Sequence, residues 1–293
     1  MGSVVRVWGP LAYLMRNVGK NDKVLRPVHP NCALEAEYRR RLKCLIDEMN
    51  RSVVYWVKAA FRANEPRITE AADEIEASPP VIAQDAIPAA ALKRAVRKLT
   101  RRWKSRFDEA ADELADWFGQ SVSDRSDKAL QSILRKGGIS VKFKMSRAQR
   151  DVLHATVNQN VALIKSIPSR YLQNVEGIVM RGVQTGRDLQ QITKGLQKEF
   201  GVTRRRAELI SRDQSSKATS ALTRARQIEL GITEAIWIHS HAGKTPRPTH
   251  VAMHGKKFDV VKGMWDADEG EWVHPGTLIN CRCVARSLVK GFS

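Results

Sequence analysis

Apolar side chains recur every three or four positions along most of this chain, the spacing that places them on one face of an α-helix. One such stripe runs from Leu34 to Phe61 and a second from Leu92 to Phe118. Helical spacing then continues, with interruptions, from Ser146 to Leu230. We therefore predict a mainly α fold, a long helical body that leads into a small C-terminal α+β or irregular module rich in His and Cys.

Glycine, proline and capping residues divide this helical region. Gly137 and Gly138 end a helix, and the segment Ile139 to Met145 alternates apolar and polar side chains like a short strand. Ser146, followed three residues later by Gln149, has the spacing of a capping box that begins the next helix. The remaining predicted breaks and caps are Pro168, Gly186, Gly201, Thr203 and Gly231.

A change of composition marks the domain boundaries. Residues 64–88 are acidic, alanine-rich and interrupted by prolines, which do not fit a helix interior, so we predict a linker there. It separates an N-terminal arm and helix that dock on a partner, residues 1–63, from a basic helical body, residues 89–231. After Gly231 the helical spacing stops, and residues 232–293 form the C-terminal module.

The charge balance favours a polyanionic partner. The chain has 50 basic and 31 acidic side chains, a net charge of +19, and self-repulsion at that charge opposes compact folding unless counter-charge is supplied. Double-stranded DNA is the first candidate, contacted through phosphates without sequence preference, and acidic surfaces of protein partners are the second. A solvated basic surface without a ligand is the third interpretation. The candidate contact residues are Lys93, Arg94, Arg97, Lys98, Arg101, Arg102, Lys104, Arg106, Arg204, Arg205 and Arg206.

Several classes of protein do not fit the sequence. The longest stretch without Asp, Glu, Lys or Arg, Val152 to Ile164, is shorter than a membrane span, and the first residues lack the pattern of a signal peptide, so we expect a soluble, non-secreted protein. Four cysteines are too few for a disulfide framework, and Cys44, beside the first stripe, is predicted to be a small buried side chain. No phosphate-binding glycine loop or nucleophile elbow occurs, and no catalytic residue is predicted.

A cluster of histidines and cysteines near the C-terminus has the composition of a zinc site. Imidazole and thiolate are the ligands that Zn²⁺ prefers, and the candidates are His250, His254, His274, Cys281 and Cys283. A single residue separates the two cysteines, fewer than in common zinc sites, so hydrogen-bonded packing without metal is the alternative. A metal-dependent nuclease or other DNA-processing hydrolase is a further alternative, weakened because the acidic residues between Asp259 and Glu271 are scattered.

The same region resembles a known family. It is similar to the C-terminal signature of phage head-morphogenesis proteins of the phage Mu F type, the minor head proteins. The residues that carry the similarity are Trp237, His239, Arg247, His250, His254, Gly255, Lys256, Phe258, Pro275, Asn280, Cys281, Arg282 and Cys283. Segments Ala207–Gln214 and Arg224–Ile232 resemble the helix that precedes this signature, and the resemblance spans about Ala89 to Leu288.

The resemblance implies a non-enzymatic component of the phage head, synthesised in the host cytoplasm and located in the virion. Its partners would be the portal protein, the major capsid protein or a scaffold, and packaged DNA. We further predict that Trp237, Trp265 and Trp272 fill the core of the C-terminal module, since large aromatic side chains dominate burial in small modules. Arg247, Asn280 and Arg282 are interpreted as residues that brace its loops.

Overall fold

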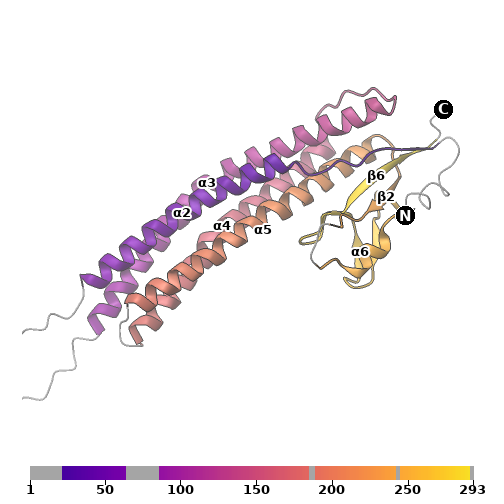
Figure 1. Cartoon of the computed structure of the whole chain (residues 1–293). Helices are drawn as coiled ribbons and strands as arrows, with labels where there is room; N and C mark the ends of the chain where they lie inside the picture. Colours follow the sequence, from indigo (N-terminus) through magenta and orange to yellow (C-terminus); the bar gives the residue numbers. More distant parts are fainter. Residues whose placement is uncertain (1–21, 64–85, 185–188, 242–244, 291–293) are drawn as a thin grey trace, which may run out of the picture. The chain divides into compact units, whose positions relative to one another are not determined.

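The computed structural model describes residues 22–63, 86–184, 189–241 and 245–290. Four long helices make up most of it: α2, Cys32–Arg62; α3, Ala86–Lys136; α4, Arg147–Gln184; and α5, Leu189–Glu229 (Figure 1). The predicted mainly α fold is confirmed. Among the described residues, no helix is long and apolar enough to cross a membrane.

The strands gather at the end of the chain, apart from the first. A four-stranded antiparallel sheet has the order β1-β6-β2-β3, and a separate hairpin pairs β4 with β5. The bounds are Lys23–Val24 for β1, Glu234–Ile238 for β2, Lys257–Asp259 for β3, Met264–Asp266 for β4, Glu271–Val273 for β5 and Val284–Val289 for β6. The short helix α6, Pro248–Met253, lies between β2 and β3 in the chain. A small α+β module at the C-terminus is therefore confirmed.

The chain divides into two compact units, and α2, α3, α4 and α5 each contribute to both. The helical unit consists of Arg39–Leu114, in its described part, and Asn160–Glu208. The mixed unit consists of the described residues up to Tyr38, Ala115–Gln159 and the described residues from Leu209 onward.

The helical unit buries the apolar stripes that the sequence predicts. From α2 and α3 its fully or almost fully buried side chains include Leu42, Ile46, Met49, Val53, Val57, Leu92, Val96, Leu99, Trp103 and Phe107. The hydroxyl group of the buried Tyr171 donates a hydrogen bond of 2.8 Å to Asn50 Oδ1. Ion pairs join Lys43 to Glu208 and Arg204 to Asp47. Helix segments distant in sequence are thus held together by apolar burial and by polar contacts at its border.

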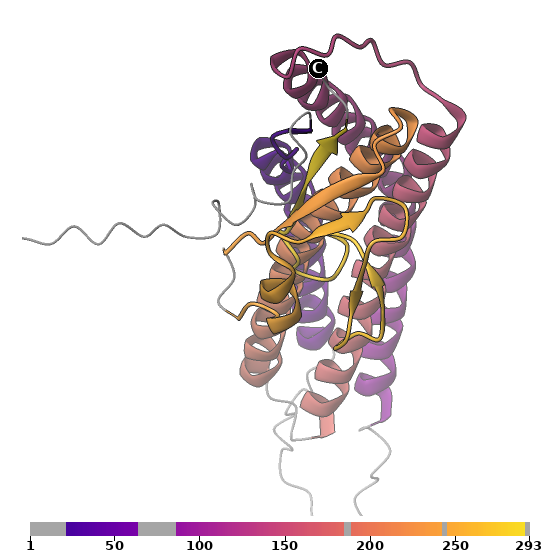
Figure 2. The same ribbon diagram turned by 90° about the vertical axis from the view of Figure 1, so that its right-hand side faces the viewer.

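In the mixed unit, the sheet lies against helix segments (Figure 2). Gln227 Nε2 of α5 donates a hydrogen bond of 2.8 Å to Ser287 Oγ of β6, and both side chains are buried. Near β1, Leu25 and Val28 join Leu130 and Leu134 of α3 in one apolar cluster. The N-terminal segment is therefore part of this unit, because its strand pairs with β6 and its apolar side chains share a core with α3.

Two predicted helix breaks are wrong. Pro168 lies inside α4 and Gly201 inside α5. Thr203 does not cap a helix, because its Oγ1 donates a hydrogen bond of 3.0 Å to the carbonyl oxygen of Glu199 one turn earlier. Pro168 removes one backbone hydrogen bond from α4, but the neighbouring Ile167 and Tyr171 are buried, and their burial compensates for the loss.

The segment Ile139 to Met145 is extended, but no strand pairs with it among the described residues. The apolar side chains of this segment do alternate with polar ones: Ile139, Val141 and Phe143 are partly buried against the cluster that contains Leu134. The alternating pattern therefore reflects packing against a helix rather than sheet pairing. The predicted cap that follows is present, since the backbone N–H of Gln149 donates a hydrogen bond of 3.0 Å to Ser146 Oγ.

Cys44 is exposed, which corrects the prediction that it is buried. It points away from the stripe because its neighbours Leu42 and Ile46 occupy the buried positions. Most of the predicted linker, up to residue 85, lies outside the described residues, as do the first 21 residues and the predicted break at Gly186. The last three linker residues, 86–88, belong to α3.

Candidate metal centre

The C-terminal module is built around one buried tryptophan. Trp237, in the middle of β2, is 0% exposed, and its ring makes edge contacts with His250 and Phe258 at centroid distances of 5.1 Å and 5.9 Å. Pro248 begins α6, where its missing N–H and fixed φ are compatible with a helix start. His250, two residues later, is thereby held against the tryptophan ring.

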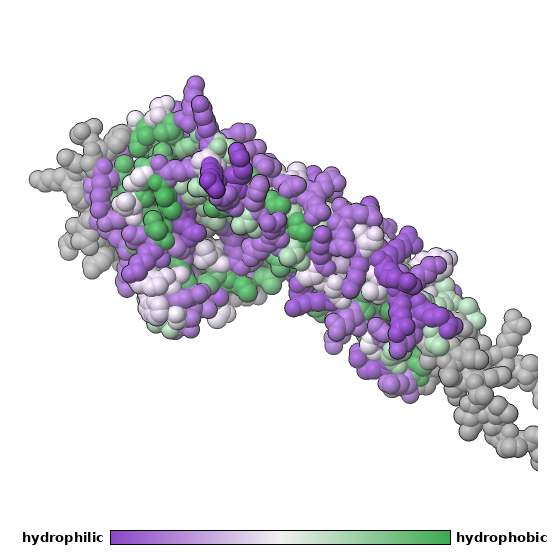
Figure 3. Space-filling model, turned by 180° about the vertical axis from the view of Figure 1, so that it is seen from behind, coloured by the Kyte–Doolittle hydropathy of each residue, from purple (hydrophilic) through white to green (hydrophobic). Residues whose placement is uncertain are grey.

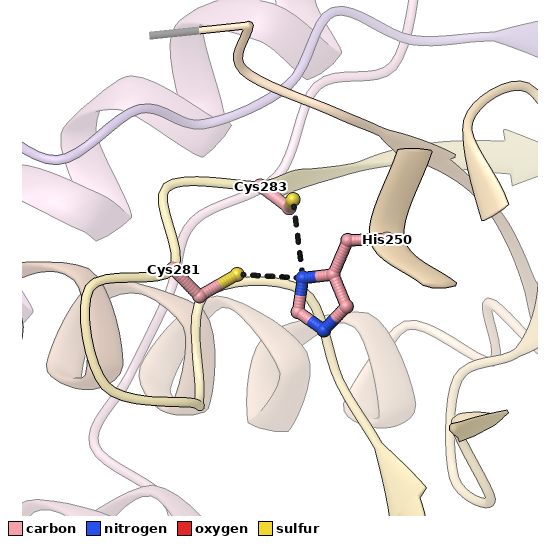
Figure 4. Close-up of side chains that lie close together, drawn as sticks. All are labelled: His250, Cys281 and Cys283. Carbon is pink, nitrogen blue, oxygen red and sulfur yellow. Dashed lines mark hydrogen bonds between the residues drawn. The ribbon is translucent and has the colours of Figure 1, made fainter. Parts of the chain in front are cut away.

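Three metal-ligating atoms meet beside this tryptophan. His250 Nδ1 lies 3.4 Å from Cys281 Sγ and 3.7 Å from Cys283 Sγ (Figure 4). All three side chains are buried, and their ligand atoms lie within 4.8 Å of one another. The histidine comes from α6 and the two thiols from the loop that leads into β6.

Backbone geometry holds the cysteine loop in place. Gly276 has a φ of +83° and its N–H donates a hydrogen bond of 3.3 Å to Cys281 Sγ. A Cβ at this position would lie 3.2 Å from the carbonyl oxygen of Cys283, so glycine suits both the conformation and the space. Asn280, with a φ of +61°, donates its N–H to Asp213 Oδ1 at 3.1 Å and accepts a hydrogen bond of 2.8 Å from Arg212. The loop is thus tied to α5.

A buried carboxylate stands behind the histidine. Asp266 is 0% exposed, and its Oδ2 lies 3.2 Å from His250 Nε2. This His250 contact lacks hydrogen-bond geometry, whereas Thr249 Oγ1 and the backbone N–H of Asp268 donate hydrogen bonds of 3.2 Å and 3.0 Å to the carboxylate. The carboxylate favours the tautomer in which Nε2 carries the proton, and this leaves the lone pair of Nδ1 facing the two sulfurs.

The two thiols differ in acidity. The hydrogen bond that Cys281 accepts from Cys283 lowers the pKa of Cys281, and the same hydrogen bond together with burial raises the pKa of Cys283. Cys281 is therefore the more acidic sulfur, and the thiolate is the form of cysteine that binds metals.

An open cleft of about 530 Å³ borders His250, Cys281 and Cys283. Among the described residues, its lining includes three arginines, Arg212, Arg247 and Arg282, but no Asp or Glu. Arg247 contacts two residues that do not line the cleft. Its Nε lies 3.3 Å from Glu269, and its NH1 donates a hydrogen bond of 3.0 Å to the carbonyl oxygen of Ile279. The cleft therefore has the charge of an anion-binding surface.

The structure does not bring the other two candidate ligands to this group. His254 Nδ1 accepts a hydrogen bond of 3.0 Å from the backbone N–H of His239, and His274 Nε2 lies 3.1 Å from the carbonyl oxygen of Val260. Burial lowers the pKa of both imidazoles, so both are favoured in the neutral form. They serve hydrogen bonds within the module, whereas His250 faces the thiols.

Two residues of the candidate site escaped the sequence prediction. Asp266 was grouped with scattered acidic residues, yet it is buried against His250. His239, 7% exposed, was noted only as part of the family signature, yet it lines the cleft. Nothing in the spacing of either residue signals this, since both are brought to the site by strand pairing.

The predicted burial of three tryptophans holds for Trp237 alone. Trp265 and Trp272 are 50% and 47% exposed. They face each other across the β4–β5 hairpin at a centroid distance of 5.9 Å, and Lys262 Nζ lies 3.9 Å from the centre of the Trp272 ring. Pairing in the hairpin places both side chains on one face of a two-stranded ribbon, and that face is open to solvent.

The basic residues of α3 lie on the surface of the helical unit. The eight side chains from Lys93 to Arg106 that the sequence singles out are all exposed. Among the three arginines of α5, Arg205 is exposed, while Arg204 pairs with Asp47 at 3.5 Å and Arg206 donates a hydrogen bond of 2.8 Å to Ser166 Oγ. The side of the molecule drawn in Figure 3 is largely hydrophilic.

In a comparison with known protein families, the C-terminal half of the chain contains a match. Residues 173–286 match the model of a family described as "Phage Mu protein F like protein". The predicted resemblance is confirmed over these residues, a shorter span than the Ala89 to Leu288 expected from the motifs. The matched span contains α5, His250 and both buried cysteines.

A relative extends the similarity over almost the whole chain. An uncharacterized protein of Haemophilus influenzae is 29% identical over 280 residues, which is 94% of this chain. The chain spans 57% of the length of that relative. No solved structure was found to match the chain.

Proposed function

Starting from the match of residues 173–286 to the Phage Mu protein F like family, we propose that this chain is a minor head protein of a tailed phage that acts in head morphogenesis. The family match is the observation that carries the proposal. The partners that fit it are the portal protein, the major capsid protein or a scaffold. The protein would be synthesised in the host cytoplasm and assembled into the virion head.

A structural role agrees with how the matched region is built. His250, Cys281 and Cys283 are buried, and among the described residues the cleft beside them is lined by arginines without a carboxylate that could serve as a general base. The competing hypothesis is a metal-dependent nuclease that uses the His/Cys cluster. We expect no nicking of supercoiled plasmid by the purified chain with Mg²⁺, Mn²⁺ or Zn²⁺, and cleavage that His250→Ala abolishes would favour the nuclease.

Head assembly is the direct test of the proposal. We expect peptides of this protein in gradient-purified phage particles, and we expect a nonsense mutation in its gene to lower the yield of infectious particles. Expression from a plasmid should restore the yield. Normal heads that lack the protein, made at normal yield without it, would contradict the proposal.

We further propose that the basic face of α3 contacts DNA phosphates during packaging or ejection. The support is the surface position of all eight basic side chains between Lys93 and Arg106. Each phosphate contact releases counterions, so the logarithm of the binding constant should fall with the logarithm of the salt concentration, with a slope of about −0.9 per contact. Substituting four residues by glutamine, Arg94, Arg97, Arg101 and Lys104, should make that slope shallower by about 3 to 4.

A matched control removes the same charge elsewhere. Arg125, Lys128, Arg135 and Lys136 are exposed on the part of α3 that belongs to the mixed unit, and their replacement by glutamine gives a variant of equal net charge. Fluorescence anisotropy with one labelled duplex over a range of NaCl concentrations compares the variants. Equal slopes for both variants would mean that net charge, rather than this face, determines DNA binding.

A further inference from the structure

The geometry points to a zinc site in the mixed unit, held by His250 Nδ1 and the thiolates of Cys281 and Cys283, with a fourth coordination position open to the arginine-lined cleft for a phosphate group. This inference does not depend on the proposed function. It applies whether the chain acts in a phage head or elsewhere.

The donor atoms already have the spacing that zinc imposes. With Zn–S bonds of about 2.3 Å, Zn–N bonds of about 2.05 Å and tetrahedral angles, sulfur and nitrogen ligands lie roughly 3.5 Å apart. The two S···N distances, 3.4 Å and 3.7 Å, lie on either side of this value. These two distances match tetrahedral zinc coordination, and all three donor atoms lie within 4.8 Å of one another.

The surroundings of the histidine match those of a metal ligand. Metal-binding imidazoles generally direct their second nitrogen to a carboxylate, which fixes the tautomer and raises the basicity of the ligating nitrogen. His250 Nε2 lies 3.2 Å from Asp266 Oδ2, and that carboxylate is itself buried and accepts hydrogen bonds from Thr249 and Asp268. A carboxylate is a costly group to bury, and orienting a ligand is a role that accounts for this one.

The sulfur pair also offers a cation two donor atoms beside the imidazole nitrogen. The single lone pair of His250 Nδ1 faces two sulfurs, so only one thiol at a time can donate to it. The backbone N–H of Gly276, which donates to Cys281 Sγ at 3.3 Å, stabilises negative charge on that sulfur. A divalent cation satisfies all three donors at once and neutralises two thiolates.

The cleft identifies the chemistry of the fourth ligand. His250, Cys281 and Cys283 all line it, so an ion bound to them borders the cleft. Two thiolates and a neutral imidazole leave bound Zn²⁺ without net charge, so the charge of the lining comes from its arginines. Arg247 is ion-paired with Glu269, so Arg212 and Arg282 supply most of this positive charge. Guanidinium groups bind phosphate through paired hydrogen bonds, and a three-ligand zinc site accepts an exogenous oxygen at its fourth position.

The first experiment is metal analysis of the full chain, purified without affinity tags that bind metal and with reduced thiols. We expect about one zinc ion per chain, and at least a tenfold loss of zinc affinity in Cys281→Ser, Cys283→Ser and His250→Ala. The matched controls Cys32→Ser and Cys44→Ser, at exposed thiols, should retain zinc. Asp266→Asn keeps all three ligands and should lower zinc affinity about 10- to 100-fold.

The second experiment replaces zinc by cobalt in the wild-type protein, so that it does not depend on variants that fold. We expect thiolate-to-cobalt charge-transfer bands and the d–d bands of tetrahedral Co²⁺. Inorganic phosphate should shift the d–d bands at lower concentration than acetate does, and Arg282→Gln should raise the phosphate concentration required.

Four results would overturn the inference. Wild-type protein that carries reduced Cys281 and Cys283 but binds no zinc would exclude the site, and so would a disulfide between them in the freshly purified protein. A cobalt spectrum that phosphate leaves unchanged would exclude the open position, and a preference for acetate would exclude phosphate as its ligand.

Discussion

Trp237→Ala is expected to lower the free energy of unfolding by about 3–5 kcal/mol, the usual cost of removing a large aromatic side chain from a core. The side chain is 0% exposed and contacts the rings of both His250 and Phe258. Its removal therefore leaves a cavity in the centre of the C-terminal module and loosens the helix that carries His250. Urea denaturation followed by circular dichroism measures the loss.

Two other tryptophans of the same module provide the control. Trp265 and Trp272 are 50% and 47% exposed on the β4–β5 hairpin, so their replacement by alanine creates no cavity. Each substitution should cost less than about 1 kcal/mol, as expected for partly exposed positions. A cost for Trp265→Ala as large as that for Trp237→Ala would contradict the assignment of Trp237 as the centre of this core.

Arg226→Ala is expected to cost about 3 kcal/mol, near the lower end of the range for breaking a buried ion pair. The Arg226 side chain is 3% exposed, and its guanidinium donates to both carboxylate oxygens of Asp127, at 2.9 Å and 2.7 Å, and to Glu229 at 2.8 Å. It also donates to the carbonyl oxygen of Lys144 at 2.8 Å. The Asp127 hydrogen bonds raise the pKa of Arg226.

The loss of stability arises from the two carboxylates that remain when Arg226 is removed. Without Arg226, two carboxylates that are only 19% and 25% exposed lose their counter-charge. Arg226→Lys keeps the charge but not the paired geometry, so we expect an intermediate loss. The control is Arg125→Ala, at an exposed position of α3 in the same unit, with an expected change within about 0.5 kcal/mol. Equal effects of the two alanine substitutions would contradict the role of Arg226 as the link between α3 and α5.

Periodicity predicted the helices well, since apolar stripes have to be buried wherever they occur. Local breakers were less informative. Pro168 and Gly201 have weak helix preference, yet both lie inside long helices, because buried side chains lie nearby on the same helix: Ile167 and Tyr171 near Pro168, and Leu196 and Thr203 near Gly201. Intrinsic preferences of about 1–3 kcal/mol per residue are small beside the burial of several apolar side chains.

The residue types in the C-terminal region predicted the chemistry of the candidate site, but they did not predict which residues form it. His250 and His254 are four residues apart, which would place both rings on one face of a continuing helix. Helix α6 ends at Met253 with His254 as its C-cap, and the His254 ring accepts a hydrogen bond from the backbone N–H of His239 instead of joining the thiols. Where so short a helix ends is decided by packing around it, which spacing alone does not reveal.

The pairing of β1 with β6 has a consequence for the order of events during synthesis. Lys23 and Val24 pair with Val289 and Leu288, so β1 can take its place in the sheet only after β6, far later in the sequence, has been synthesised. Contacts between such distant positions form slowly. Until the sheet closes, Lys23 and Val24 stay accessible to chaperones and proteases, and their pairing reports that β6 has been synthesised and has joined the sheet.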